Sequence, residues 1–269
     1  MKFFLLFFSA LILTFTSCAS DDAKSSPDEN YILPKTIILK EIGSPVDQTL
    51  TTNTFSGNKI VSSITGNFKI LYSYEGNLIT KEETFILDPN AEVKERKTRE
   101  ILHTYENGKL KTSILMRLFT AANPNGQYAS KIVYTHTSDN LISYVEYSVT
   151  TGTPEEKIVD RGILTFKDGN LVKYEQYFMD SPTLTGTFQY EYDTSNNPFK
   201  NVLGYRSLKV KTSAAGNNNV IRGSSTIENI VDQTIFRNTF TYNDKGYPIL
   251  SIETKGYGTE IDSETRYTY

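Results

Sequence analysis

The stretch that decides the fold class is FKILYSYEGNL, residues 68–78. Aromatic and aliphatic residues alternate with polar ones from Phe68 to Glu75, and only Leu71 departs from the pattern. A period of two residues is typical of a β-strand with one buried face and one face in water. Gly76 and Asn77 then predict a tight hairpin turn, because such turns need residues that tolerate positive φ.

The same arrangement recurs along the chain, with an aromatic-rich strand, a Gly or Asn turn and an apolar start to the return strand. Further copies span residues 55–60, 105–110, 138–141, 166–171, 192–199 and 242–248. The turns lie roughly 30 residues apart, which accommodates two strands and two connections. Thr, Ile, Tyr, Val and Phe are abundant beyond residue 31, and β-branched and aromatic residues favour strands.

These hairpins predict an all-β fold: a single, strongly curved antiparallel meander sheet, half-barrel or barrel-like, over residues 31–269. We expect a long exposed strand in 92–100, although its charge pattern would also suit a helix. Residues 199–205 are expected to form a short helical or irregular excursion, and residues 213–219 a loop. No boundary divides the region into two domains.

Composition excludes several classes of protein. The 269 residues carry a formal net charge of −3, with 28 basic and 31 acidic side chains, so no basic footprint for nucleic acid is present. The single cysteine excludes an internal disulfide framework and a zinc site built on several thiolates.

Residues 1–17 are predicted to be an export signal, because Lys2 precedes an apolar run from Phe3 to Phe15. Small residues then lead into Cys18, and the segment resembles a bacterial lipobox, in which the cysteine is lipidated. Phe15 departs from the Leu, Val or Ile that is commoner there. The alternative is that Cys18 is an ordinary residue near a conventional cleavage site. The lipobox interpretation makes residues 18–30 a lipidated cysteine followed by a flexible tether.

The residues after the cysteine include Ser20, Asp21 and Asp22. They resemble the surface-export signal of Bacteroidota lipoproteins, which implies an outer-membrane, lipid-anchored protein that faces the cell exterior. The alternative is a merely polar tether.

The hairpins at 190–193 and 240–248 contain Tyr-x-Tyr-Asp and Phe-Thr-Tyr-Asn-Asp motifs. They resemble the YD repeats of RHS-type proteins. Together with residues 197–201, 217–220 and 266–269, they resemble still more a family of Bacteroidota lipoproteins of unknown function with a porin-like β fold. The resemblance implies a curved or closed antiparallel sheet, and it brings no catalytic residues.

Candidate chemistry is sparse. His103 and His136 each occupy a strand without the spacing of a metal or catalytic motif, so no metal and no cofactor is expected. Three acids are flanked by tyrosines, an arrangement that suits sugar binding but is also common in ordinary strands. The candidate ligand surface consists of Tyr144, Glu146, Tyr147, Tyr174, Glu175, Tyr177, Tyr190, Glu191 and Tyr192.

The sequence therefore predicts a membrane-anchored, non-catalytic binding or structural protein, with a glycan or an envelope protein as candidate partner. Two alternatives stay open. One is a surface protein that binds or degrades glycans, and the other is an integral outer-membrane β-barrel. Charged residues scattered along the strands argue against the integral barrel.

Overall fold

The computed structural model describes residues 31–149, 156–179, 181–227, 230–256 and 258–269. The sequence-predicted features at Cys18, Ser20, Asp21 and Asp22 lie outside these residues. Sixteen strands are described: β1 Thr36–Glu41, β2 Thr49–Ser56, β3 Lys59–Thr65, β4 Phe68–Glu75, β5 Leu78–Leu87, β6 Glu95–Glu106, β7 Lys109–Arg117, β8 Gln127–Ser138, β9 Leu141–Val149, β10 Glu156–Lys167, β11 Asn170–Tyr177, β12 Leu184–Tyr192, β13 Val220–Ile227, β14 Ile230–Tyr242, β15 Pro248–Lys255 and β16 Ile261–Thr268.

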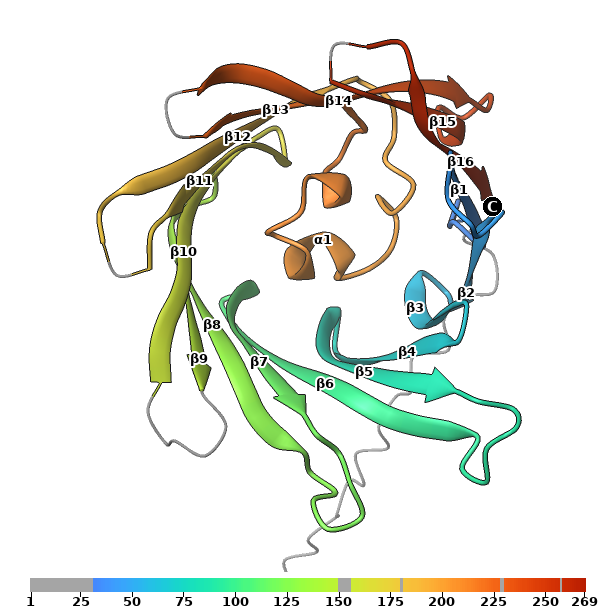
Figure 1. The fold of residues 1–269 in the computed structure, drawn as a ribbon, viewed down its shortest axis with the longest axis vertical. Coiled ribbons are helices and arrows are strands. Elements are labelled where there is room, and N and C mark those ends of the chain that lie inside the picture. Colours follow the sequence, from blue (N-terminus) through green and yellow to red (C-terminus); the bar gives the residue numbers. More distant parts are fainter. Residues whose placement is uncertain (1–30, 150–155, 180, 228–229, 257) are drawn as a thin grey trace, which may run out of the picture.

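Each strand pairs antiparallel with its neighbour in the chain, and the last strand pairs with the first. The register between β1 and β16 runs from Thr36 opposite Thr268 to Glu41 opposite Ser263. The sheet is therefore a closed barrel (Figure 1). The expected all-β meander of hairpins is confirmed, and of the two expected shapes the structure is the barrel.

In β4 the wall alternates as the sequence predicts, and Tyr74 points inward. Tyr74 of β4 donates its hydroxyl to the carbonyl oxygen of Leu203, which lies in the lumen, at 3.2 Å. The hairpins share a further feature: the register shifts beside the turn, as between Ser73 and Tyr74 and between Thr104 and Tyr105. Such a β-bulge adds one residue to a strand and strengthens its twist, which helps a long meander to curve closed.

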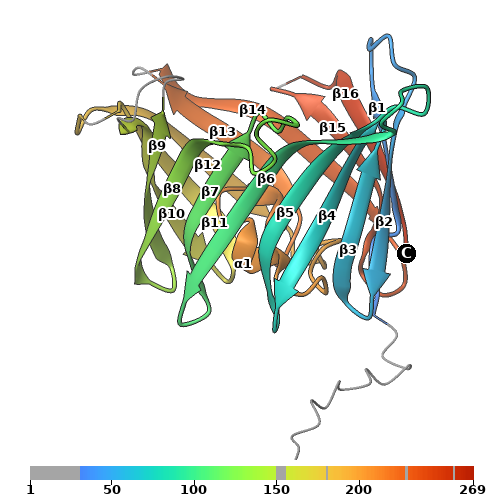
Figure 2. The same ribbon diagram turned by 90° about the horizontal axis from the view of Figure 1, so that it is seen from below.

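The two ends of the barrel differ in their connections (Figure 2). At one end, five of the connections are two-residue turns, and Gly76 and Gly108 in two of them have φ of 56° and 75°, where glycine carries no Cβ penalty. The described chain also begins and ends there, since Lys35 donates its backbone N–H to Thr268 at 2.8 Å. At the other end, which we call the mouth, residues 42–48, 88–94 and 118–126 form longer loops.

The connection between β12 and β13 is different from every other turn. Residues 193–219, here called the insert, include α1 (Tyr205–Leu208) and η1 (Ser213–Ala215). The insert folds into the barrel, and Figure 1 shows α1 inside the ring of strands. The excursion expected at 199–205 and the loop expected at 213–219 both belong to it, whereas β6 begins at Glu95 within the strand expected over 92–100.

The outer face of the wall carries charges paired along or between strands. Glu191 of β12 and Arg222 of β13 lie 2.7 Å apart, and Lys173 lies 2.7 Å from Glu175 on β11. Large apolar side chains are scattered among them, including Leu102 and Ile235. No helix among the described residues has the length and apolar character to cross a membrane.

Candidate functional site

The insert closes one end of the barrel by packing apolar side chains into the lumen. Val202 and Leu208 join Ile60 and Ile79 of the wall in one buried cluster. Val210 joins a second cluster with wall residues such as Leu164, which is fully buried. Removing these apolar surfaces from water is the main force that holds the insert in place.

Asparagines fix the backbone of the insert, within itself through the buried Asn197 and against a short turn through Asn217. Asn197 donates its side-chain amide to the carbonyl of Ala214 at 2.9 Å and accepts from the backbone N–H of Phe199 at 2.9 Å. Asn217 donates to the carbonyl of Asp168, in the turn between β10 and β11, at 2.7 Å. Gly204 has φ of 73°, and a Cβ there would lie 2.8 Å from a backbone carbonyl of that end of the barrel. These contacts satisfy polar groups that burial would otherwise leave unpaired.

Above the insert, toward the mouth, lies an open cavity of about 420 Å³. The wall of β5–β9 contributes most of its lining, and Leu208, Lys209, Lys211 and Thr212 of the insert form the rest. The lining mixes apolar side chains with charged ones: Arg99, Arg117, Lys209 and Lys211 are the cations, and Glu82 and Glu146 are the anions. A cavity of this size falls within the range of small-molecule sites.

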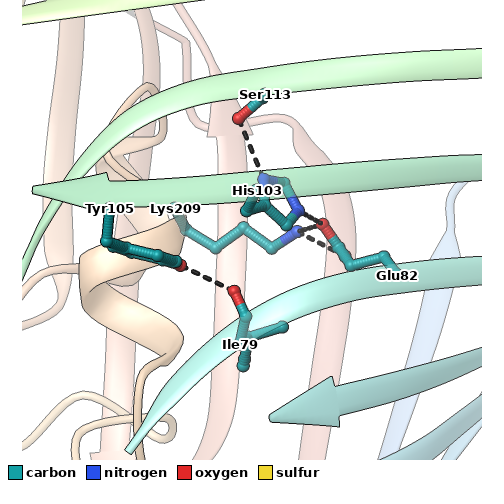
Figure 3. A network of polar contacts seen from close by, with 6 residues as sticks. All are labelled: Ile79, Glu82, His103, Tyr105, Ser113 and Lys209. Carbon is teal, nitrogen blue, oxygen red and sulfur yellow. Dashed lines mark hydrogen bonds and ion pairs between the residues drawn. The ribbon is translucent and has the colours of Figure 1, made fainter. Parts of the chain in front are cut away.

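A buried ion-pair network joins the wall to the insert (Figure 3). Lys209 donates to the two carboxylate oxygens of Glu82 at 2.8 and 3.1 Å. His103 lies between Glu82 and Ser113, with Nε2 3.2 Å from the carboxylate and Nδ1 2.9 Å from the hydroxyl. Burial by itself would raise the pKa of Glu82, but His103 and Lys209 outweigh it and lower that pKa to about 2. Glu82 is therefore ionised at neutral pH, and its charge holds Lys209.

A second network lies around Lys211, whose Nζ is 3.3 Å from Asp160 and 3.6 Å from Glu146. The same ammonium lies 3.8 Å from the centre of the Tyr144 ring, within cation–π range. Tyr144 donates to Asp160 at 2.7 Å, and its hydroxyl lies 2.6 Å from that of Tyr174. Burial and these two partners raise the pKa of Tyr144, so it stays a neutral hydrogen-bonding group.

The fold is shared with a solved structure. A porin-like protein from Bacteroides vulgatus superposes with a TM-score of 0.56 at 12% identity, over 89% of this chain and 99% of that one. A porin-like protein from Bacteroides uniformis matches at a TM-score of 0.37 and 11% identity, over 87% and 97% of the two chains. The first likeness establishes the fold alone. No protein-family model matches the chain, and no curated protein matches it.

The nine residues of the sequence-predicted ligand surface lie on the two faces of the barrel wall. Tyr147, Glu175, Tyr177 and Glu191 point outward, where Glu175 and Glu191 pair with Lys173 and Arg222 and the two rings lie under Lys131 and Arg161. The other five point inward. Tyr144, Glu146 and Tyr174 come together around Lys211, whereas Tyr190 and Tyr192 lie against the insert. The structure thus brings together three of the nine.

Sequence reasoning found Glu146 but missed the other charged groups that line the cavity. Glu82 and Lys209 are 127 positions apart and meet only because the insert folds back into the lumen. Lys209 and Lys211 flank Val210 with a spacing of two. This pattern predicts an extended segment, but it does not predict which part of the wall that segment contacts. His103 was expected to be an ordinary strand histidine, and the structure places it between Glu82 and Ser113. Within the described residues, no group of three or more His, Cys, Asp or Glu side chains could hold a metal ion.

Proposed function

We propose that this chain is a lipid-anchored outer-membrane protein at the cell surface, whose barrel is a non-catalytic binding cup. One observation carries the proposal: the lumen is closed at one end by the insert and leads at the mouth to a charged cavity of about 420 Å³. A glycan or an envelope protein segment is the candidate ligand. A lumen closed in this way suits holding a ligand better than letting it pass.

The outer wall supports a barrel outside the bilayer. A membrane-spanning barrel presents an apolar band to lipid, and a charged side chain near the middle of the bilayer costs about 2–4 kcal/mol. Ion pairs such as Glu191–Arg222 and Lys173–Glu175 lie on that outer face. The integral-barrel alternative would have to bury these charges in hydrocarbon.

The position of the first described residues supports the orientation of the cup. Leu33 packs with Val202 of the insert, and Asn201 donates to the carbonyl of Ile32 at 3.2 Å. A tether that leads from Cys18 therefore meets the barrel at its closed end. With the lipid in the membrane, the mouth would point away from it.

A chain of contacts from Ser113 through His103 to Glu82 favours hydrolysis as a second candidate function. Two features make binding the better proposal. Ser113 lies in mid-strand between His103 of β6 and Ile132 of β8, so the ladder on both sides uses the backbone N–H groups that an oxyanion hole would need. The lowered pKa of Glu82 also makes it unsuited to act as the general acid of a glycosidase.

The test of the cup is a ligand screen with glycans and envelope peptides on the full-length protein in non-ionic detergent, followed by two variants. Ser130→Trp fills the cavity and should abolish binding of any hit, whereas Val133→Trp, on the outward side of the same strand, should retain it. Equal binding by both variants would show that the ligand does not bind in the lumen. Turnover of an ester or glycoside that is lost in Ser113→Ala would instead establish the enzyme.

Location is tested separately in intact cells. The wild-type protein should fractionate with the membrane, resist extraction less than an integral barrel does in alkaline carbonate, and be cleaved by added protease. Cys18→Ala should release it from the membrane. Complete protection from protease on intact cells would contradict surface exposure.

A further inference from the structure

Two arginines lie directly opposite each other on the inner wall near the mouth. Arg99 of β6 and Arg117 of β7 are register partners, and both line the cavity. Like charges directly opposite on an antiparallel pair are destabilising. The repulsion between these two positive charges therefore lowers the stability of the protein without a ligand.

Neither guanidinium makes an ion pair or hydrogen bond with any residue that the structure describes. The other cations of the cavity are matched, Lys209 by Glu82 and Lys211 by Asp160 and Glu146. The outer wall offers a direct contrast, because Arg222 and Arg237 are also register partners, and there Glu191 lies 2.7 Å from Arg222. The inner pair is thus the place in the cavity where positive charge has no counterpart.

The chemistry of the two arginines and of the residues around them indicates which ligand groups they can bind. A planar guanidinium with five N–H donors matches carboxylate, sulfate and phosphate oxygens in two-point contacts. Below the arginines the lining changes to Ile101, Leu115 and Ile132, with Ser113 and Ser130 between them. A ligand seated here would place its anionic group at the mouth and an apolar face against the wall.

We infer that Arg99 and Arg117 bind the anionic group of a small organic anion, carried as a carboxylate, sulfate ester or phosphate ester. The inference rests on the proposed function, because it names the chemistry of the ligand that the cup holds. Its negative charge would offset the repulsion between the two guanidinium groups, and the cavity volume of about 420 Å³ would accept a molecule of about disaccharide size.

The test is calorimetric titration of the full-length protein in non-ionic detergent with a uronate disaccharide, a sulfated disaccharide, a sugar phosphate and a neutral disaccharide. At least one anion should bind, with an affinity that falls as salt rises. Arg99→Gln/Arg117→Gln should lose at least tenfold in affinity for it, while the control Arg222→Gln/Arg237→Gln keeps the wild-type value. Comparison among the three anionic probes identifies the source of the charge.

Several outcomes would overturn the inference. Equal anion affinity in the two double variants would mean that the inner pair is not the site. Binding of the neutral disaccharide alone would refute the anion site but not the proposed binding function. If none of the probes binds and the ligand screen also finds nothing, both the anion site and the binding function are refuted. Thermal unfolding without ligand is a further check: Arg99→Gln/Arg117→Gln should be as stable as wild type or more so, and a clear loss of stability would mean that the arginines already have partners.

Discussion

The two ends of the barrel are built from the same strands but differ in what they bury. At the closed end, short turns and the insert enclose apolar side chains such as Ile79 and Leu164, both fully buried. At the mouth, residues such as Val93 and Leu184 are 64% and 49% exposed. The difference teaches that the core of this barrel forms only where the insert packs against the inner side chains of the wall. A wall of sixteen strands is too wide for its own side chains to fill, and the mouth stays open where the insert does not reach.

The largest expected effect contrasts two leucines. Leu164→Ala at the closed end should lower the free energy of unfolding by about 3 kcal/mol, because it leaves a cavity beside Val210. Leu184→Ala near the mouth removes the same atoms from a half-exposed site and should change it by less than about 0.5 kcal/mol. Denaturant unfolding of both variants measures the difference. Equal losses would show that the mouth also has a packed core.

The ion pair between wall and insert gives the closed end a dependence on pH. The native pKa of Glu82 is about 2, below its ordinary value of 4.5, so the ionised form stabilises the fold. That contribution is complete above about pH 4.5 and is lost as pH falls toward 2, on the order of 3 kcal/mol in all. Glu82→Gln should remove this part of the acid sensitivity, as measured by unfolding at pH 7 and pH 3.

Glu156→Gln is the control for this pH dependence. Glu156 begins β10 near the mouth and pairs with Lys131 on the outer wall, where solvent screens the pair. Its stability curve should follow that of the wild type at both pH values. If Glu82→Gln also follows the wild type, the network in Figure 3 does not fasten the insert.

Two asparagines allow the closed end and the mouth to be compared by the loss of side-chain hydrogen bonds. Asn197→Ala should cost about 2 kcal/mol, because it leaves the backbone N–H of Phe199 and the carbonyl of Ala214 without their buried partner. Asn123→Ala, in a mouth loop, removes one bond of 3.3 Å to Leu118 where water is available, and should cost less than about 0.5 kcal/mol. The measurement is again denaturant unfolding, and a larger loss for Asn123→Ala would reverse the comparison.

The smallest expected effect is one that the two ends should share. Gly76 and Gly66 turn the chain at the closed end and the mouth with φ of 56° and 57°, and a Cβ at either would touch nothing. Alanine at each should cost about 1 kcal/mol of left-handed backbone strain. Gly204→Ala, whose Cβ would meet the wall, should cost clearly more. Unequal values at Gly66 and Gly76 would mean that turn strain depends on the end.

The local rules of the fold could be predicted from sequence because they act over a few residues. Alternation in 68–75 told which residues share a face, and glycine or asparagine at each turn located the hairpins. Six of the seven predicted hairpin turns lie together at the closed end, since strands of an antiparallel meander return to the same end at every second turn. The hairpin predicted at 192–199 was wrong, because the insert follows β12 and the return strand β13 begins only at Val220. Closure into a barrel depends on the pairing of β1 with β16, whose partners are 232 positions apart at Thr36 and Thr268, and no local pattern specifies such a contact.

By itself the sequence determined an all-β meander with a polar and an apolar face, because the alternation of polar and apolar residues is a property of neighbouring positions in the chain. Only the tertiary structure decided that the sheet closes into a barrel and that residues 193–219 fill one end. It also decided that Glu82 meets Lys209 while Arg99 and Arg117 lie unmatched. The physical reason is the same in each case. Ion pairs and cavities form between segments that are distant in the sequence, and those segments come into contact only when the barrel closes around the insert.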